Sequence, residues 1–191
     1  GLVVLDTSDK RSPAPVSQFY LGGGFDIEKK GTLVFIAAGK KGMKIVDVSD
    51  PRSPFLKGEA ETPGVAKAVA VSGPHAFIAD GPSGLLVFDI KNPGHPRLIA
   101  SFETPGEAEG IILLGDLALV ADGDAGLEII DVHNPAAPKK RSSFNTQGKA
   151  RQTAVSGNYA FIANGASGLA VLDISDPSSP KQTAALMTSS Y

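Results

Sequence analysis

The sequence contains no cysteine, so it can form neither a disulfide bond nor a thiolate metal site, and it offers no cysteine nucleophile. Tryptophan is also absent, and only three histidines are available for metal binding or acid–base chemistry. No run of 18 consecutive apolar residues occurs, so we expect no transmembrane segment. The formal net charge is −2, so the chain lacks the excess of basic residues that is typical of nucleic-acid-binding proteins. We therefore expect no nucleic-acid partner.

Glycine and proline, by contrast, are abundant. The 22 glycines and 14 prolines are dispersed among apolar segments, which disfavours long helices and favours short strands joined by turns. An internal repeat dominates the chain: GLVVLDTSDKRSP, GMKIVDVSDPRSP, GLLVFDIKNPGHP, GLEIIDVHNPAAP and GLAVLDISDPSSP start 41, 42, 42 and 42 residues apart. A fixed period of this length is typical of repeat architectures, among them β-propellers.

Each full period contains four strand candidates. In one period these are residues 66–72, 76–80, 85–90 and 97–103, separated by Gly, Pro, Asn or Asp turns. The second and third candidates are apolar at nearly every position, which indicates strands covered on both faces, and the fourth is more polar. Four antiparallel strands in about 42 residues match one propeller blade. We therefore predict an all-β fold, a β-propeller of four-stranded antiparallel blades.

The strand count predicts about four and a half blades. A half blade falls at residues 1–21, and full blades fall at roughly 24–62, 65–104, 107–146 and 149–188. Bare sheet edges at the two ends would invite pairing with other chains, which natural proteins avoid. We therefore expect this segment to belong to a larger ring, or to a ring that a partner chain closes by pairing with the open blade edges.

The repeated segments carry a family resemblance. GLVVLD, GMKIVD, GLLVFD, GLEIID and GLAVLD, each followed by a turn of the [DN]-P-x-x-P kind, resemble the LVIVD repeat, a β-propeller repeat of bacterial and archaeal proteins. The first copy departs from the pattern, since Lys10 replaces the proline after Asp9. The resemblance covers essentially the whole chain. It implies a propeller fold and an extracellular or cell-surface location, but no particular chemistry.

Two groups of acidic residues compete as candidate sites. A catalytic centre needs one constellation, whereas a feature present in every repeat is better explained as a structural turn. We assign that structural role to the aspartate that ends each third strand: Asp6, Asp47, Asp89, Asp131 and Asp173. Asp122 and Asp124 hint at a calcium loop, but the third acidic ligand and the distal glutamate are absent, so a glycine turn is the favoured interpretation. We expect no metal and no cofactor.

The copies disagree most at the entrance of the first strand of each blade. Because successive strands reverse direction, these entrances lie on one face, around the mouth of the central channel. Polar groups that converge on a concave surface are candidates for binding. The residues predicted to form this rim are Asp26, Lys67, Glu107, Glu109, Lys149 and Arg151. An ion-pair network between neighbouring blades would explain the same residues without a ligand.

Three functions remain open on these grounds. The first is a non-enzymatic scaffold that binds a protein or surface component through the channel-mouth face. The second is a structural subunit of a larger extracellular assembly. The third is a hydrolase or lyase with a metal at the channel mouth, which a propeller fold neither supports nor excludes.

Overall fold

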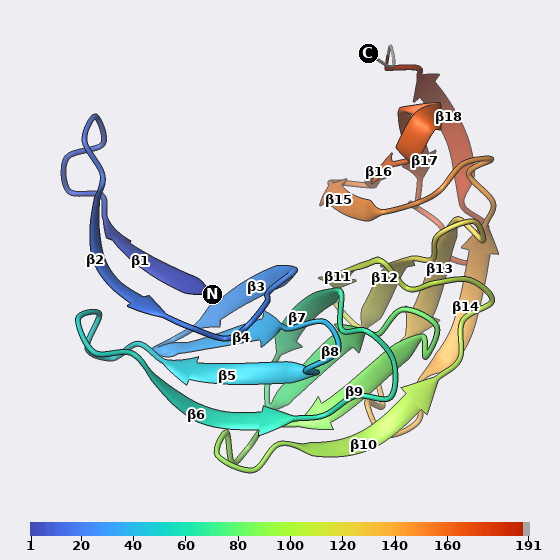
Figure 1. Cartoon of the computed structure of the whole chain (residues 1–191). Helices are drawn as coiled ribbons and strands as arrows, with labels where there is room; N and C mark the ends of the chain where they lie inside the picture. The colour runs from blue at the N-terminus through green and yellow to red at the C-terminus, as the bar shows by residue number, and fades with distance from the viewer. Residues whose placement is uncertain (189–191) are drawn as a thin grey trace.

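In the computed structural model, which describes residues 1–188, the chain forms antiparallel sheets that follow one another along an open arc (Figure 1). A two-stranded sheet comes first, and four four-stranded sheets follow it. Within every sheet, strands adjacent in sequence are hydrogen-bonded neighbours. The predicted all-β, propeller-type repeat of four-stranded antiparallel sheets is therefore confirmed.

The strand bounds repeat with the period of the sequence. The two-stranded sheet consists of β1 (Leu2–Asp6) and β2 (Ala14–Phe19). The first two four-stranded sheets consist of β3 (Asp26–Lys30), β4 (Leu33–Ala37), β5 (Met43–Asp47) and β6 (Phe55–Ala60), and of β7 (Ala68–Ser72), β8 (His75–Ala79), β9 (Leu85–Asp89) and β10 (Arg97–Phe102). The last two consist of β11 (Gly110–Leu114), β12 (Leu117–Ala121), β13 (Leu127–Asp131) and β14 (Lys139–Phe144), and of β15 (Gln152–Ser156), β16 (Tyr159–Ala163), β17 (Leu169–Asp173) and β18 (Lys181–Leu186).

The helical content of the described residues is a single 3-10 turn, η1 (Gly165–Ser167). No helix within residues 1–188 is long and apolar enough to cross a membrane.

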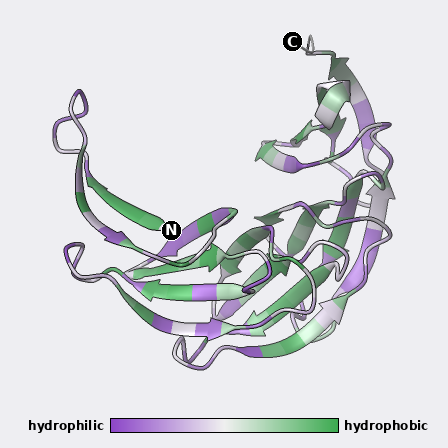
Figure 2. Ribbon diagram, in the orientation of Figure 1, coloured by the Kyte–Doolittle hydropathy of each residue, from purple (hydrophilic) through white to green (hydrophobic). Residues whose placement is uncertain are grey.

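The hydrophobic core lies between the sheets. Phe35 and Met43 of one sheet pack against Ile78 and Phe88 of the next, and all four side chains are buried. The middle strands of each sheet are accordingly the most hydrophobic parts of the ribbon (Figure 2). A sheet held between two others must be apolar on both faces, which explains why β8, β9, β12 and β13 show no alternation of apolar and polar residues.

The two sheets at the ends of the arc are covered on one face only. Val3 and Leu5 of β1 are half-exposed, whereas the residues at the same repeat positions in β9, Leu86 and Phe88, are buried. At the other end, Tyr159 of β16 is also half-exposed. The apolar residues on these end faces have the pattern of an inner sheet without the neighbour that would cover it.

The turn after each third strand is shaped by its aspartate. The Oδ1 atom of each of these aspartates accepts a hydrogen bond from the backbone N–H two residues later, at 2.8–3.0 Å; the five residues are Asp6, Asp47, Asp89, Asp131 and Asp173. This is the local bonding that stabilises Asx turns. All five lie at the ends of strands in equivalent turns, as folding chemistry requires.

Candidate functional site

The innermost strands β3, β7, β11 and β15 lie next to one another on the concave side of the arc (Figure 1). Pairs of backbone hydrogen bonds fix the start of three of them to the loop of the preceding sheet: Gly39 with Ala66, Gly81 with Ala108, and Gly123 with Ala150, at 2.9–3.1 Å. The residue after each of these alanines is Lys67, Glu109 or Arg151. These three side chains are thus placed in register by backbone contacts that do not depend on their identity.

The side chains at these strand entrances surround one hollow of about 480 Å³. Its lining consists of Phe25, Asp26, Lys67, Glu107, Glu109, Lys149, Arg151 and Gln152. The structure therefore brings all six residues predicted for the rim to one place. We call this site the channel-mouth hollow.

Two glutamates and two lysines form an ion-pair network in the hollow. The Lys67 Nζ atom lies 2.8 Å from Glu109 Oε1 and 3.3 Å from Glu107 Oε2. From the other side, Lys149 Nζ lies 3.5 Å from Glu109 Oε1 and 3.7 Å from Glu107 Oε2. Within residues 1–188, Arg151 has no carboxylate at ion-pair distance. The hollow thus combines neutralised charges with one free cation.

The network changes the ionisation of its members. Burial opposes the charged form of Glu109, but the hydrogen bond from Lys67 and the positive charges of Lys67 and Lys149 outweigh it and hold the pKa of Glu109 below its usual value. Burial likewise opposes the charge of Lys67, and its bonds to Glu109 and Glu107 raise the pKa of Lys67 above its usual value. Both groups are charged at neutral pH.

The rim has an aromatic member that the sequence interpretation missed. Strand pairing aligns Asp26 with Ala68, because each lies opposite the last residue of the second strand, so the equivalent of Lys67 is Phe25. The Phe25 side chain is 67% exposed. The Asp26 carboxylate lines the hollow, but it accepts a hydrogen bond from the Val69 N–H at 3.0 Å. Counting back from the turn glycines Gly31 and Gly73, rather than forward from the preceding loop, would have found Phe25.

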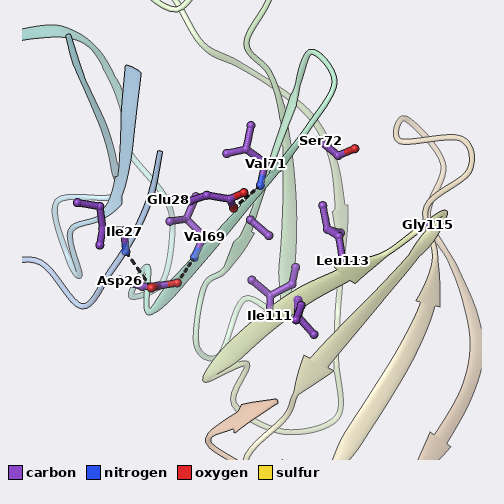
Figure 3. A pocket seen from close by; sticks show the side chains of 11 residues that line it. Asp26, Ile27, Glu28, Val69, Val71, Ser72, Ile111, Leu113 and Gly115 are labelled. Carbon is purple, nitrogen blue, oxygen red and sulfur yellow. Dashed lines mark hydrogen bonds between the residues drawn. The ribbon is translucent and has the colours of Figure 1, made fainter. Parts of the chain in front are cut away.

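Deeper along the innermost strands lies a second hollow of about 530 Å³ (Figure 3). Glu28 contributes a carboxylate there and accepts a hydrogen bond from the Val71 N–H at 2.7 Å. Apolar side chains, including Ile111 and Leu113, line the same hollow. Burial raises the pKa of Glu28 against the opposing effect of this hydrogen bond. The carboxylates of Asp26 and Glu28 thus accept hydrogen bonds from backbone N–H groups along the edge of β7. This contact explains why β3 carries two carboxylates.

Comparison with known proteins identifies the repeat. A family model of the LVIVD repeat matches residues 22–62, 63–104, 105–146 and 147–188. The chain belongs to the LVIVD repeat family. No match is found among curated protein sequences.

Solved structures share the fold of these LVIVD repeats. The computationally designed Ika4 protein has a TM-score of 0.66 at 10% identity, over 81% of this chain and 92% of that one. The computationally designed Ika8 protein has a TM-score of 0.67 at 10% identity, over 85% of this chain and 48% of that one. At this identity the likeness concerns the fold alone.

The two candidate calcium ligands in the LVIVD repeat at residues 105–146 differ in burial and in hydrogen bonding. Asp122 is fully buried and accepts hydrogen bonds from the Thr104 hydroxyl at 2.6 Å and the Gly106 N–H at 2.8 Å. Burial raises the pKa of Asp122, in opposition to these bonds. Asp124 is exposed. Residues 1–188 contain no group of three or more His, Asp or Glu side chains that could hold a metal ion, and Asp122 acts as a structural acceptor.

The ion-pair network of the LVIVD rim predicts a titration result. In Lys67→Gln, Glu109 loses its closest cation while its burial remains, so its pKa is expected to rise. Carboxyl-carbon NMR titration of Glu109 measures this directly. Lys91→Gln, an exposed change in the turn after β9, should leave the Glu109 titration unchanged. An unshifted Glu109 in Lys67→Gln would show that the network does not hold in solution.

Proposed function

We propose that this LVIVD-repeat chain is a non-enzymatic scaffold that binds a protein partner through the channel-mouth hollow. One observation carries the proposal: a hollow of about 480 Å³ holds the exposed aromatic ring of Phe25 and the uncompensated charge of Arg151 beside a compact ion-pair network. A concave surface that combines an aromatic anchor with a few fixed polar groups is typical of recognition sites.

The difference between scaffold and rim supports the same function. Phe25, Lys67, Glu109 and Arg151 occupy one repeat position on four successive sheets, yet they differ in charge and shape. Folding chemistry alone would favour the same residue type at each copy, as it does for the strand-ending aspartates. Variation confined to one face of a constant scaffold is how repeat proteins acquire binding specificity.

The family resemblance supports an extracellular or cell-surface location for this binding function. The half-exposed apolar side chains at the two ends of the arc favour a second candidate function, that of a subunit in a larger extracellular assembly. No observation favours the hydrolase or lyase alternative.

A charge reversal at the rim tests the binding function. Arg151→Glu should abolish retention of the partner. The substitution removes the cation that is free to bind the partner and adds a third carboxylate to the hollow beside Glu107 and Glu109. Arg52→Glu makes the same charge change in an exposed turn at the opposite ends of the strands and should retain the partner. Quantitative affinity capture from surface extracts of the source cells, with the two variants and the parent chain in parallel, measures the difference.

Equal capture by all three chains would remove the channel-mouth hollow as the site. Circular dichroism should show the same fold for both variants, since Arg52 and Arg151 are exposed.

A further inference from the structure

The second hollow, of about 530 Å³, contains the free edge of strand β11. β11 pairs with β12 on one side and with no strand on the other. Its sheet lies in the middle of the arc, since β11 contacts both β7 of the preceding sheet and β15 of the following one. The free edge therefore faces the concave interior of the arc. An edge of this kind can pair with an added strand.

The turn at the end of β11 determines which backbone groups are free. Leu114 and Leu117 flank a two-residue loop, so they form a hydrogen-bonded pair of the β11–β12 ladder. Hydrogen-bonded and non-hydrogen-bonded pairs alternate along an antiparallel ladder. The N–H and C=O groups of Ile111 and Leu113 therefore point away from β12, on the side of the free edge, and both residues line the hollow.

The preceding junction shows how such edge groups are satisfied elsewhere in the chain. Val69 and Val71 of β7 have the repeat positions of Ile111 and Leu113, and their N–H groups donate to carboxylates of β3. Figure 3 shows both of these hydrogen bonds. The residues of β7 at the positions of those carboxylates are alanines, which have no side-chain acceptor. β7 therefore leaves the edge donors of β11 uncapped.

The lining of the hollow selects the chemistry of an occupant. Its charged members are Asp26 and Glu28, and neither lysine nor arginine lines it. The two carboxylates would repel an anionic ligand, so neutral amide carbonyls are the acceptors that fit the β11 donors. The N–H and C=O groups of Ile111 and Leu113 recur at the spacing of an extended main chain. Glu28 bonds to the Val71 N–H through Oε2, and within residues 1–188 its Oε1 atom has no hydrogen-bond partner.

We propose that the free edge of β11 binds an extended segment of a partner protein that carries a lysine or arginine. The segment adds as a strand beside β11, so that its carbonyl oxygens accept from the N–H groups of Ile111 and Leu113. Its own N–H groups donate to the carbonyls of the same two residues. The basic side chain of the segment pairs with Glu28. This site is distinct from the channel-mouth hollow and is tested separately.

A labelled peptide tests the site. The probe is a fluorescein-labelled peptide of sequence TVKVT with an amidated C-terminus, and fluorescence anisotropy measures its binding to the full chain. Glu28→Gln should weaken binding by about fivefold, because the charge is lost. The amide oxygen of the variant can still accept from the Val71 N–H, so the β7 edge stays capped. Glu61→Gln, an exposed change between β6 and β7, is the matched control and should bind as the parent does.

A substitution in β7 should cap the β11 edge from within the chain. Ala70 has the repeat position of Glu28, and it lines the hollow. In Ala70→Glu, the new carboxylate can accept from the Leu113 N–H as Glu28 does from the Val71 N–H. Peptide binding should be lost, and hydrogen exchange at the Leu113 amide should slow without peptide. Circular dichroism checks the fold of this variant, and Glu28→Gln supplies the test at an existing polar position.

The outcomes distinguish the possible occupants. Weaker binding by Glu28→Gln, together with peptide-induced shifts of the Ile111 and Leu113 amide NMR signals, supports the site. Absence of peptide binding, or equal binding by the parent and Glu28→Gln, overturns it. Equal binding of a peptide methylated at its backbone nitrogens would exclude strand addition, and tighter binding of TVEVT would exclude a basic ligand. A dimer of the chain that Ala70→Glu disrupts would assign the edge to a second copy and also overturn the proposal.

Discussion

Replacing Gly84 by alanine is expected to destabilise the fold by about 3 kcal/mol or more, one of the two largest effects that the structure predicts for a single substitution. Gly84 has a φ of +69°, and it lies where β9 begins beside the end of β10. A methyl group there would overlap the Phe102 carbonyl oxygen and lie 2.8 Å from the Thr104 nitrogen. Backbone strain and collision therefore act together, and equilibrium urea denaturation measures the loss.

A second glycine separates these two causes. Gly73 has a φ of +52°, but nothing lies within 4 Å of an added methyl group. Gly73→Ala should therefore cost only the strain of the left-handed conformation, about 1–2 kcal/mol. Equal destabilisation of the two variants would mean that collision with β10 contributes nothing at Gly84. In that case the close approach of backbone at the start of each third strand would not be the reason for its glycine.

Asp122→Ala is expected to destabilise the fold by about 3 kcal/mol, because it removes a buried acceptor and leaves two partly buried donors without a partner. The donors are the Thr104 hydroxyl and the Gly106 N–H, which join the β10–β11 connection to the β12–β13 loop. The last repeat carries a neutral counterpart: Asn164 accepts from the Thr146 hydroxyl at 2.6 Å and donates to the Thr146 carbonyl at 2.8 Å. Asp122→Asn should therefore cost less than Asp122→Ala.

The same aspartate predicts a pH dependence. Because burial raises the pKa of Asp122 above 3.8, the folded state favours the protonated carboxyl. Its contribution to stability is then fully present below the unfolded pKa and is lost as the pH rises through the folded-state pKa. The stability of the parent chain relative to Asp122→Asn should consequently fall as the pH rises above about 4.

Urea denaturation of both chains at a series of pH values measures this difference. Asp124→Asn, an exposed change two residues away, should track the parent chain at every pH. Parallel profiles for the parent and Asp122→Asn would show that Asp122 ionises in the fold as it does in the unfolded chain.

Much of the fold could be predicted because the same pattern of strands and turns recurs in successive repeats of the sequence. The candidate strand at residues 76–80 corresponds to β8 (His75–Ala79), and that at 97–103 corresponds to β10 (Arg97–Phe102). Burial on both faces gave the middle strands their unbroken apolar character, and the antiparallel order followed from short turns. The same topology placed the first-strand entrances on one face, and the side chains predicted there do line one hollow.

The remaining features depend on contacts that no single repeat contains. The loop GGG before β3 disturbs the spacing of the first full repeat, so alignment from that side selected Asp26 and passed over Phe25. The bond between Thr104 and Asp122 joins loops 18 residues apart, and its geometry depends on how two hairpins pack. Whether Lys67 bonds to Glu109 across neighbouring sheets likewise depends on the angle between the sheets, which the sequence pattern leaves open.

The paired backbone bonds between Gly81 and Ala108, and their counterparts at the other two junctions between four-stranded sheets, have a consequence for how the channel-mouth rim can change. They give each of these junctions the same backbone geometry, which does not depend on the side chains that follow. Duplication or deletion of one 42-residue unit would therefore lengthen or shorten the row of rim positions by one without disturbing the spacing of the others. The number of rim positions can thus change by one repeat at a time, while the spacing of the remaining positions stays constant.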